Sequence, residues 1–329
     1  MKYQKEPLQK FPMQLAFALH NYSSHDLDIK QFNNIVFCGL GGSGIASHIV
    51  KAYFSSLCPI PMDVISDYRL PAYVNEKSLV ILNSYSGNTE ETLSNFLETQ
   101  VRKATTLILT TGGELLSLAK KQHIKYYLAE TGFQPRMALG YSFTYLLLII
   151  AELLKKNIKS ELKEIIDLLK QNEIYKEKAL NLFNQIKNDT GRKFIIVCDQ
   201  YSSAIGLRFA QQINENAKAE AFINILPETN HNVIETFYAY NHINSVFIFM
   251  DSHQNPRVSL RFDFLYELLK EQKLNILRYD FEDYSLKTIF NTIYIFDWLS
   301  LIIADVRKVK SDEIPNINRL KNFLADKQA

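Results

Sequence analysis

Three hydroxyl side chains lie close together in the segment 84–89. Ser84, Ser86 and Thr89 follow an apolar run, SLVILN, that is typical of a buried strand. Gly87 lets the chain turn, and two glutamates after Thr89 indicate the start of a helix. Hydroxyl donors and the exposed N–H groups of a helix start suit a phosphate monoester, which needs several donors around a compact anion. The segment has no lysine, unlike a nucleotide P-loop. We therefore predict a phosphate site here.

A second loop, GLGGSG (39–44), follows the apolar run NIVFC and precedes a helical stretch. Its G-x-G-x-x-G spacing is the dinucleotide fingerprint, and Asp67 lies 23 residues beyond the last glycine. Taken alone, the loop favours a nicotinamide enzyme. The physical requirement is broader, because glycines let backbone N–H groups approach any phosphate or sugar oxygen. Ser43 adds a hydroxyl that dinucleotide folds do not need, so Gly41, Gly42 and Ser43 are further candidates for holding a phosphate.

The elements that must position these loops alternate between short apolar runs and helical stretches. We predict strands at 34–38, 62–65, 78–83, 105–110 and 124–128, and again at 193–197, 221–225, 245–250 and 274–279. We predict buried helices from 137 and at 288–304, a helix at 231–240 and a last helix at 314–325. This alternation indicates βαβ units and parallel sheets. Residues 155–189 lack strands and predict two solvated helices that link the two halves.

Composition narrows the class of protein. The 329 residues favour two domains, and 37 basic against 35 acidic side chains give a net charge of +2, too small to favour nucleic acid or anionic lipid as a partner. The three cysteines are far apart, which argues against a disulfide framework and a cysteine-based zinc site. The N-terminus lacks an apolar signal-peptide core, and the apolar run 137–151 is shorter than the roughly 20 residues of a spanning helix. We expect a cytoplasmic protein without a membrane partner.

Five motifs occur in the order that one known family shows. They are GLGGSG (39–44), SYSGNTEET (84–92), QPRMALGY (134–141), NENAKAEAF (214–222) and LPETNHN (226–232). With them the chain resembles, over nearly its whole length, the bifunctional phosphoglucose/phosphomannose isomerase family of the phosphoglucose isomerase superfamily. The resemblance implies an α/β fold of two tandem SIS domains, each flavodoxin-like with a parallel five-stranded sheet. We expect an N-terminal domain at 1–154 with the phosphate loops, a helical linker at 155–189 and a C-terminal domain at 190–329 with the catalytic residues.

The implied activity is aldose–ketose isomerisation of glucose 6-phosphate and mannose 6-phosphate to fructose 6-phosphate through a cis-enediolate, with no metal or redox cofactor. Such chemistry needs a base near C1 and C2, a cation for the enediolate oxygens and an acid/base group that opens the ring. The resemblance implies that Glu215 is the base and that His231 opens the ring from across a homodimer interface. Arg136, an always-charged group near a helix start, would stabilise the enediolate. The resemblance also implies that Lys321, in the last helix, reaches the sugar.

Two departures from the family pattern and three alternatives remain open. Val233 stands where the family usually has an acidic residue after Asn-His-Asn, and Ser47-His48 replaces a more polar or glycine-rich continuation. A non-catalytic phosphosugar-binding regulator would keep the serine loop and lose the base, whereas this chain has Glu215 and His231. A nicotinamide oxidoreductase leaves the serine loop unexplained. An isomerase of another phosphosugar is compatible with the sequence, because pocket shape sets specificity.

Overall fold

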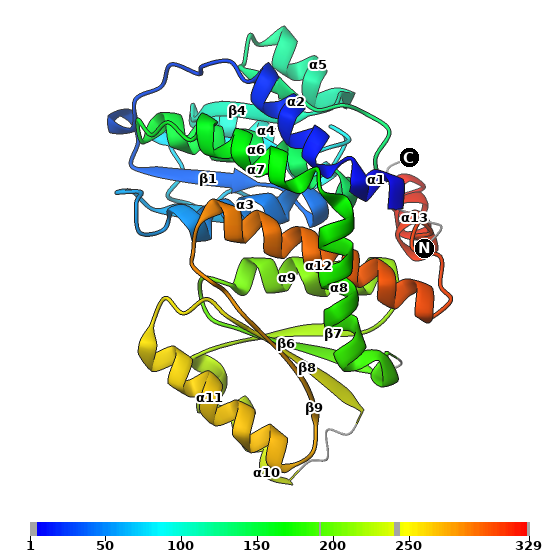
Figure 1. Cartoon of the computed structure of the whole chain (residues 1–329). Helices are drawn as coiled ribbons and strands as arrows, with labels where there is room; N and C mark the ends of the chain where they lie inside the picture. The colour runs from blue at the N-terminus through cyan, green and yellow to red at the C-terminus, as the bar shows by residue number, and fades with distance from the viewer. Residues whose placement is uncertain (1–4, 191, 240–243, 328–329) are drawn as a thin grey trace.

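Two parallel sheets form the framework of the chain, which this computed structural model describes over residues 5–190, 192–239 and 244–327 (Figure 1). The first sheet has the order β2-β1-β3-β4-β5 and the second the order β7-β6-β8-β9. The first is built from β1 (Asn34–Cys38), β2 (Met62–Ile65), β3 (Ser78–Asn83), β4 (Thr105–Thr110) and β5 (Tyr126–Leu128). The second is built from β6 (Lys193–Cys198), β7 (Ala221–Ile225), β8 (Ser245–Asp251) and β9 (Asn275–Asp280). Strands therefore form at all nine predicted places, because short apolar runs buried on both faces are typical of parallel sheets.

The prediction of five strands in each domain is wrong for the second sheet, which has four among the described residues. Only residues 281–285 separate β9 from the next helix, α12 (Leu286–Val306). The chain after α12 runs through a short connection into the last helix, α13 (Pro315–Ala325), without joining the sheet. No described segment is therefore left to extend the edge beyond β9.

Helices cover both faces of each sheet, and α3 (Gly41–Phe54), α9 (Ser203–Gln212) and α12 lie between the sheets (Figure 1). Helix α6 (Leu139–Leu153) packs beside α3 in the same core. Alternate strand residues point to opposite faces, so Ile35 and Phe37 join this central core while Val36 and Cys38 pack towards α4 (Glu90–Arg102) and α5 (Gly113–Lys121). The long α11 (Pro256–Glu271) covers the outer face of the second sheet. One continuous core thus joins the two halves.

Most of the remaining helices pack around the same core, whereas Phe237 packs in the separate core on the outer face of the second sheet. The remaining helices are α1 (Lys5–Gln9), α2 (Phe11–Asn21), α7 (Lys159–Leu169), α8 (Asn172–Ile186) and the single turn α10 (Thr236–Ala239), with short 3₁₀ turns η1 (Ile29–Gln31), η2 (Pro135–Met137) and η3 (Lys187–Asp189). The predicted linker helices are α7 and α8. They are only partly solvated, because Leu162 and Ile165 of α7 and Tyr175 of α8 are buried in the central core.

Among the described helices, α12 is apolar over 21 residues, whereas α6, from the apolar run at 137–151, has 15. By length and composition α12 could cross a membrane, yet 83% of its most apolar window is buried inside the fold. Trp298 and Tyr294 are among the largest fully buried side chains. Helix α12 is therefore the central core helix against which both halves pack.

The predicted helix at 231–240 is wrong in form. The structure has a 3₁₀ turn η5 (Glu228–His231), a second 3₁₀ turn η6 (Val233–Glu235) and α10, while Tyr240 lies outside the described residues. Asn232 separates the two 3₁₀ turns with φ −149° and ψ −67°, and its side-chain oxygen accepts from the Val233 N–H. A side chain that bonds the neighbouring backbone competes with a continuous helix.

Candidate active site

The two predicted phosphate loops meet at the carboxyl ends of the strands of the first sheet. Strands β1 and β3 are neighbours, and the chain leaves their carboxyl ends towards α3 and α4. Strand order reverses here, and the crevice outside such a switch point is where open parallel sheets bind ligands. Gly42 brings the first loop against the next motif, since a Cβ at Gly42 would lie 2.6 Å from the Pro135 carbonyl carbon. The glycine is therefore needed for close approach of two backbones.

Hydrogen bonds shape the serine loop. The Ser84 and Thr89 hydroxyls lie 2.8 Å apart, and Ser84 Oγ also accepts from the Gly87 N–H at 3.1 Å. Thr89 occupies the N-cap position of α4, but its hydroxyl makes no capping bond because it pairs with Ser84. Ser86 is exposed. The Ser43 hydroxyl accepts from the Tyr85 N–H at 3.1 Å, so the glycine and serine loops are joined directly.

Tyr85 connects the serine loop to the segment that carries Arg136. Its hydroxyl donates to the Glu130 carbonyl at 2.8 Å and accepts from the Phe133 N–H at 3.1 Å. The Tyr141 hydroxyl holds the same segment through the Glu130 carboxylate at 2.6 Å. The phosphate loops and the arginine segment are thus parts of one hydrogen-bonded unit.

Arg136 and Glu215 come from different halves of the chain and form an ion pair, with Arg136 Nη1 3.0 Å from Glu215 Oε2. The Arg136 side chain is 4% exposed and that of Glu215 is 29% exposed, so the carboxylate reaches solvent while the guanidinium supports it from inside. Burial lowers the pKa of Arg136, and the Glu215 carboxylate opposes this shift. Arg136 is therefore a buried arginine paired with the other half of the chain, not a solvated surface residue.

Glu215 lies in a π-helical turn, η4 (Ile213–Ala217), that continues α9. Such turns often occur at functional sites because the extra residue redirects a side chain. Asn214 Nδ2 donates to the Ala219 carbonyl at 2.8 Å, and the Asn216 side chain accepts from Arg136 Nε at 2.9 Å. The asparagines of the NEN motif therefore hold the turn and the arginine.

Lys218 is a site residue that the sequence reasoning missed. It ends the turn in the left-handed region with φ +54°, and its Nζ donates to the Glu215 carbonyl. The same Nζ donates to the Glu313 carbonyl at 2.6 Å. Burial lowers the pKa of Lys218, and the Arg136 charge lowers it further. The lysine lies within the NENAKAEAF motif, which was the available signal.

The connection between α12 and α13 crosses beside this pair. Three consecutive carbonyls of 311–313 accept hydrogen bonds from site residues: Ser311 from Arg136 Nη2, Asp312 from Gln134 Nε2 and Glu313 from Lys218 Nζ. Because these acceptors are backbone oxygens, which every residue has, the amino-acid sequence does not indicate that this segment belongs to the site. We call residues 311–313 the strap.

The structure does not bring His231 or Lys321 to the ion pair. His231 is exposed in η5, and no interaction within the described part of the chain links it to Glu215 or Arg136. Lys321 is on α13, where no residue is buried. The apolar side chains of that helix are open to solvent, with Leu320 57% exposed. The roles of both residues remain predictions.

The second sheet has a matching switch point between β6 and β8, but its loops carry carboxylates. Asp199 is buried after β6 and accepts from Ser202 and Ser252, which fixes the two loops to each other. Asp251 ends β8, and burial raises its pKa. Two carboxylates where the first domain has glycines and hydroxyls make this edge unsuited to a phosphate.

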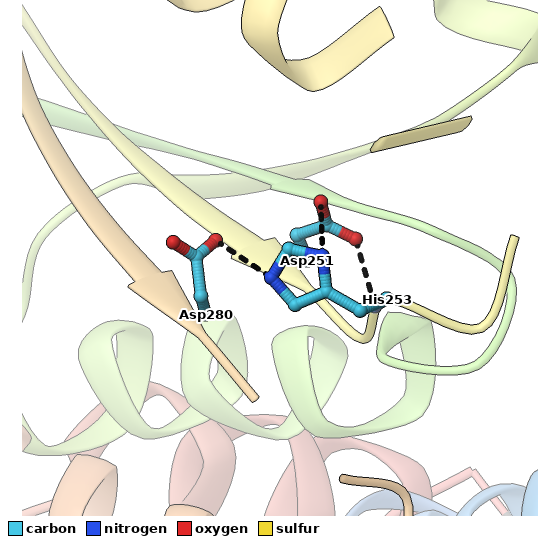
Figure 2. A group of neighbouring side chains, drawn as sticks. All are labelled: Asp251, His253 and Asp280. Carbon is cyan, nitrogen blue, oxygen red and sulfur yellow. Dashed lines mark hydrogen bonds and ion pairs between the residues drawn. The ribbon is translucent and has the colours of Figure 1, made fainter. Parts of the chain in front are cut away.

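Asp251, His253 and Asp280 form a cluster at this edge, with one potential ligand atom from each within 4.8 Å of the others. Figure 2 shows the imidazole between the two carboxylates, using Nδ1 towards Asp251 at 3.2 Å and Nε2 towards Asp280 at 3.5 Å. The two ring nitrogens point in opposite directions, so a single metal cation could not bind both of them. The Arg278 guanidinium also pairs with Asp280, at 2.9 Å, and supplies the compensating charge. This is an ion-paired cluster rather than a second site.

Comparisons with known proteins agree with this architecture. Residues 28–155 match the SIS domain model, and residues 175–324 match the model of the bacterial phospho-glucose isomerase C-terminal SIS domain. The chain is 32% identical over 325 residues to the bifunctional phosphoglucose/phosphomannose isomerase of Caldicellulosiruptor bescii, across 95% of this chain and 96% of that protein. It is 31% identical over 211 residues to the D-glucosamine-6-phosphate 4-epimerase of Sulfolobus acidocaldarius, across 64% of this chain and 65% of that protein.

A solved structure shows the same fold at low sequence identity. The C-terminal domain of glucosamine-fructose-6-phosphate aminotransferase from Francisella tularensis superposes with a TM-score of 0.70 at 15% identity, across 95% of this chain and 98% of that chain. Two parallel sheets, the hydroxyl loops and the matched models define a tandem SIS-domain enzyme of the isomerase class. The chain belongs to the bifunctional phosphoglucose/phosphomannose isomerase family.

Proposed function

We propose that this chain interconverts glucose 6-phosphate and mannose 6-phosphate with fructose 6-phosphate, without a metal, at the crevice beside Arg136 and Glu215. The observation that carries the proposal is the ion pair between the two halves of the chain, next to the hydroxyl-lined strand ends. A carboxylate held by a buried guanidinium supplies both a base and a fixed positive charge. We expect the enzyme to work in the cytoplasm.

The proposed chemistry moves one proton between two carbons of the open-chain sugar. Glu215 takes the C2 proton of the aldose, the C–H electrons form the C1–C2 double bond, and negative charge develops on the C1 oxygen. Arg136 stabilises that charge. Glu215 then returns the proton to C1 while the C2 hydroxyl proton moves to the C1 oxygen, which gives the ketose. Return of the proton to either face of C2 in the reverse direction gives glucose or mannose 6-phosphate.

The phosphate is proposed to lie at the switch point of the first sheet. Ser43, Ser84, Ser86 and Thr89 offer hydroxyls, and Gly41 and Gly42 at the start of α3 offer backbone N–H groups. Helix α3 begins without a side-chain cap, which suits an anion as its partner. This anchor holds the reacting carbons towards Glu215.

We propose that His231 opens the sugar ring in the site of a second subunit. Support comes from its position, since it is exposed and unconnected to Glu215 within the described residues of its own chain. A homodimer would place such loops against the neighbouring site.

The experiment is proton NMR of fructose 6-phosphate with the purified protein in heavy water containing EDTA. We expect deuterium at C1 and new anomeric signals from both aldose 6-phosphates. Formation of a single aldose would narrow the substrate, and loss of activity in EDTA would overturn metal independence. Binding without exchange or product would replace the enzyme by a phosphosugar-binding regulator.

A second candidate is an isomerase of another phosphosugar. The similarity to a D-glucosamine-6-phosphate 4-epimerase is the reason to test it. The same NMR experiment with glucosamine 6-phosphate distinguishes the two. Deuterium incorporation into glucosamine 6-phosphate, with none into fructose 6-phosphate, would show that the amino sugar is the substrate.

A further inference from the structure

The amide of Asn216 holds the edge of the Arg136 guanidinium opposite the substrate crevice. Asn216 is completely buried, and its Oδ1 accepts from Arg136 Nε at 2.9 Å. Because an arginine Nε can only donate, the amide atom facing it must be the oxygen. Its Nδ2 therefore points the other way and donates to Ser300 Oγ at 2.9 Å, while the Ser300 hydroxyl donates to the Asp297 carbonyl. Both ends of the amide are fixed.

The three nitrogens of Arg136 then have three different tasks. Nε binds Asn216, Nη2 binds the strap at the Ser311 carbonyl, and Nη1 meets Glu215. A planar guanidinium with two edges fixed has one remaining orientation. Asn216 thus decides which nitrogen faces the carboxylate.

The backbone of Arg136 is held as well. Arg208 Nη2 donates to the Arg136 carbonyl at 3.1 Å and pairs with Asp297 Oδ2 at 2.5 Å. Gln212 Nε2 donates to the other oxygen of Asp297 at 3.0 Å. Arg208 and Asp297 are 3% and 2% exposed. Apolar side chains of similar volume are often at least as stabilising as a buried ion pair, so a network at this place calls for a role other than stability.

We propose that Asn216 is a positioning residue for the isomerisation, acting through Arg136 on the charge at the reacting oxygens, with the Arg208–Asp297 pair holding the Arg136 backbone. This proposal rests on the function proposed above for Arg136 and Glu215. Among the described residues, no hydrogen bond joins the Asn216 side chain to the phosphate loops, so it acts on turnover rather than on phosphate affinity. Misplacing a catalytic group by about 1 Å can cost roughly 100-fold in rate.

The test compares Asn216→Ala with Asn214→Ala. Both asparagines flank Glu215 on the same π-helical turn and both are hydrogen-bonded, but Asn214 has no hydrogen bond to Arg136 among the described residues. We expect Asn216→Ala to lower kcat by roughly 10- to 100-fold with KM changed less than about threefold. Asn214→Ala should lower the melting temperature with a much smaller loss of kcat. Asn216→Asp keeps an acceptor opposite Arg136 Nε and should recover a large part of the lost kcat.

A double-mutant cycle shows whether the effect passes through Arg136. In an Arg136→Ala background, Asn216→Ala should cause little further loss of kcat, because the group it positions is already absent. Multiplicative losses, or a kcat for Asn216→Ala within about threefold of wild type, would overturn the proposal. If Asn216→Ala does not fold, Asn216→Ser takes its place in the cycle, because its shorter hydroxyl does not reach Arg136. Full activity of Arg136→Ala itself would refute the proposed function instead, so the two failures are distinguishable.

Discussion

Arg136 and Glu215 lie 79 residues apart in the chain, and their side chains meet at 3.0 Å across the boundary between the two halves. Arg136 comes from the turn before α6 and Glu215 from the π-helical turn after α9. The carboxylate therefore takes its ion-pair partner from the other half of the chain, and this pair forms only when both halves are packed together. The predictions below test this pair, its phosphate anchor and its surroundings.

Glu215→Gln should abolish turnover and leave phosphosugar binding intact. The amide keeps the size of the side chain but cannot accept the C2 proton, and general-base catalysis contributes about 10²- to 10⁴-fold. Deuterium incorporation into fructose 6-phosphate measures the loss, and calorimetric titration measures binding. Exchange at the wild-type rate would remove Glu215 from the mechanism.

Arg136→Lys should lower kcat by about 100-fold or more although the charge is kept. A lysine cannot bind Asn216, Glu215 and the Ser311 carbonyl at once, whereas a guanidinium has donors in all three directions. Steady-state kinetics in both reaction directions provide the measurement. A kcat near that of wild type would show that the charge suffices and that the fork geometry is irrelevant.

Ser84→Ala should raise KM with a small effect on kcat. Ser84 is buried beside Thr89 and the Gly87 N–H, and a hydrogen bond to a charged group contributes about 1.5–3 kcal/mol. Inhibition by inorganic phosphate should weaken in parallel. Ser94→Ala is the matched control, since Ser94 lies on α4 and bonds the Tyr68 carbonyl. An unchanged KM in Ser84→Ala would move the phosphate away from this loop.

Mixing the inactive variants Glu215→Gln and His231→Ala should restore activity. If His231 serves the neighbouring subunit, each mixed dimer contains one intact site, and full exchange gives about a quarter of wild-type activity. The variants are mixed after partial denaturation and refolding, with each variant alone as the control. Refolded mixtures that form dimers and remain inactive would place His231 in its own chain's site or outside the mechanism.

Acid should weaken the attachment of the N-terminal segment through Glu152 of α6. Burial raises the pKa of Glu152, but hydrogen bonds from Ser24 and Tyr22 outweigh this effect, so its pKa lies below the ordinary 4.5. A lowered pKa stabilises the folded state above the unfolded-state pKa, and this contribution is lost as pH falls through the folded-state value.

Urea unfolding of wild type and Glu152→Gln at pH 7 and near pH 3.5 measures this contribution. The wild type should be more stable than the variant at pH 7, and the difference should shrink at the lower pH. A difference that is constant or grows on acidification would contradict the assignment.

The sequence by itself determined the features that depend on neighbouring residues. Short apolar runs between turn residues marked all nine strands, because burial on both faces of a parallel sheet requires them. The hydroxyls of Ser84, Ser86 and Thr89 lie within six residues of one another, so their gathering at a strand end could be predicted without knowing the fold. The motifs containing Arg136 and Glu215 were likewise visible in the chain.

Only the tertiary structure decided how these pieces meet. The contact of Arg136 with Glu215 and Asn216 depends on packing between distant helices, and the strap contributes backbone carbonyls that have no sequence signature. The hydrogen bonding within the serine loop was also decided by the fold, since the Thr89 hydroxyl pairs with Ser84 and does not cap α4. Sequence patterns report local backbone preference and burial, whereas a site built from two halves is fixed by long-range packing and by the need to satisfy buried polar groups.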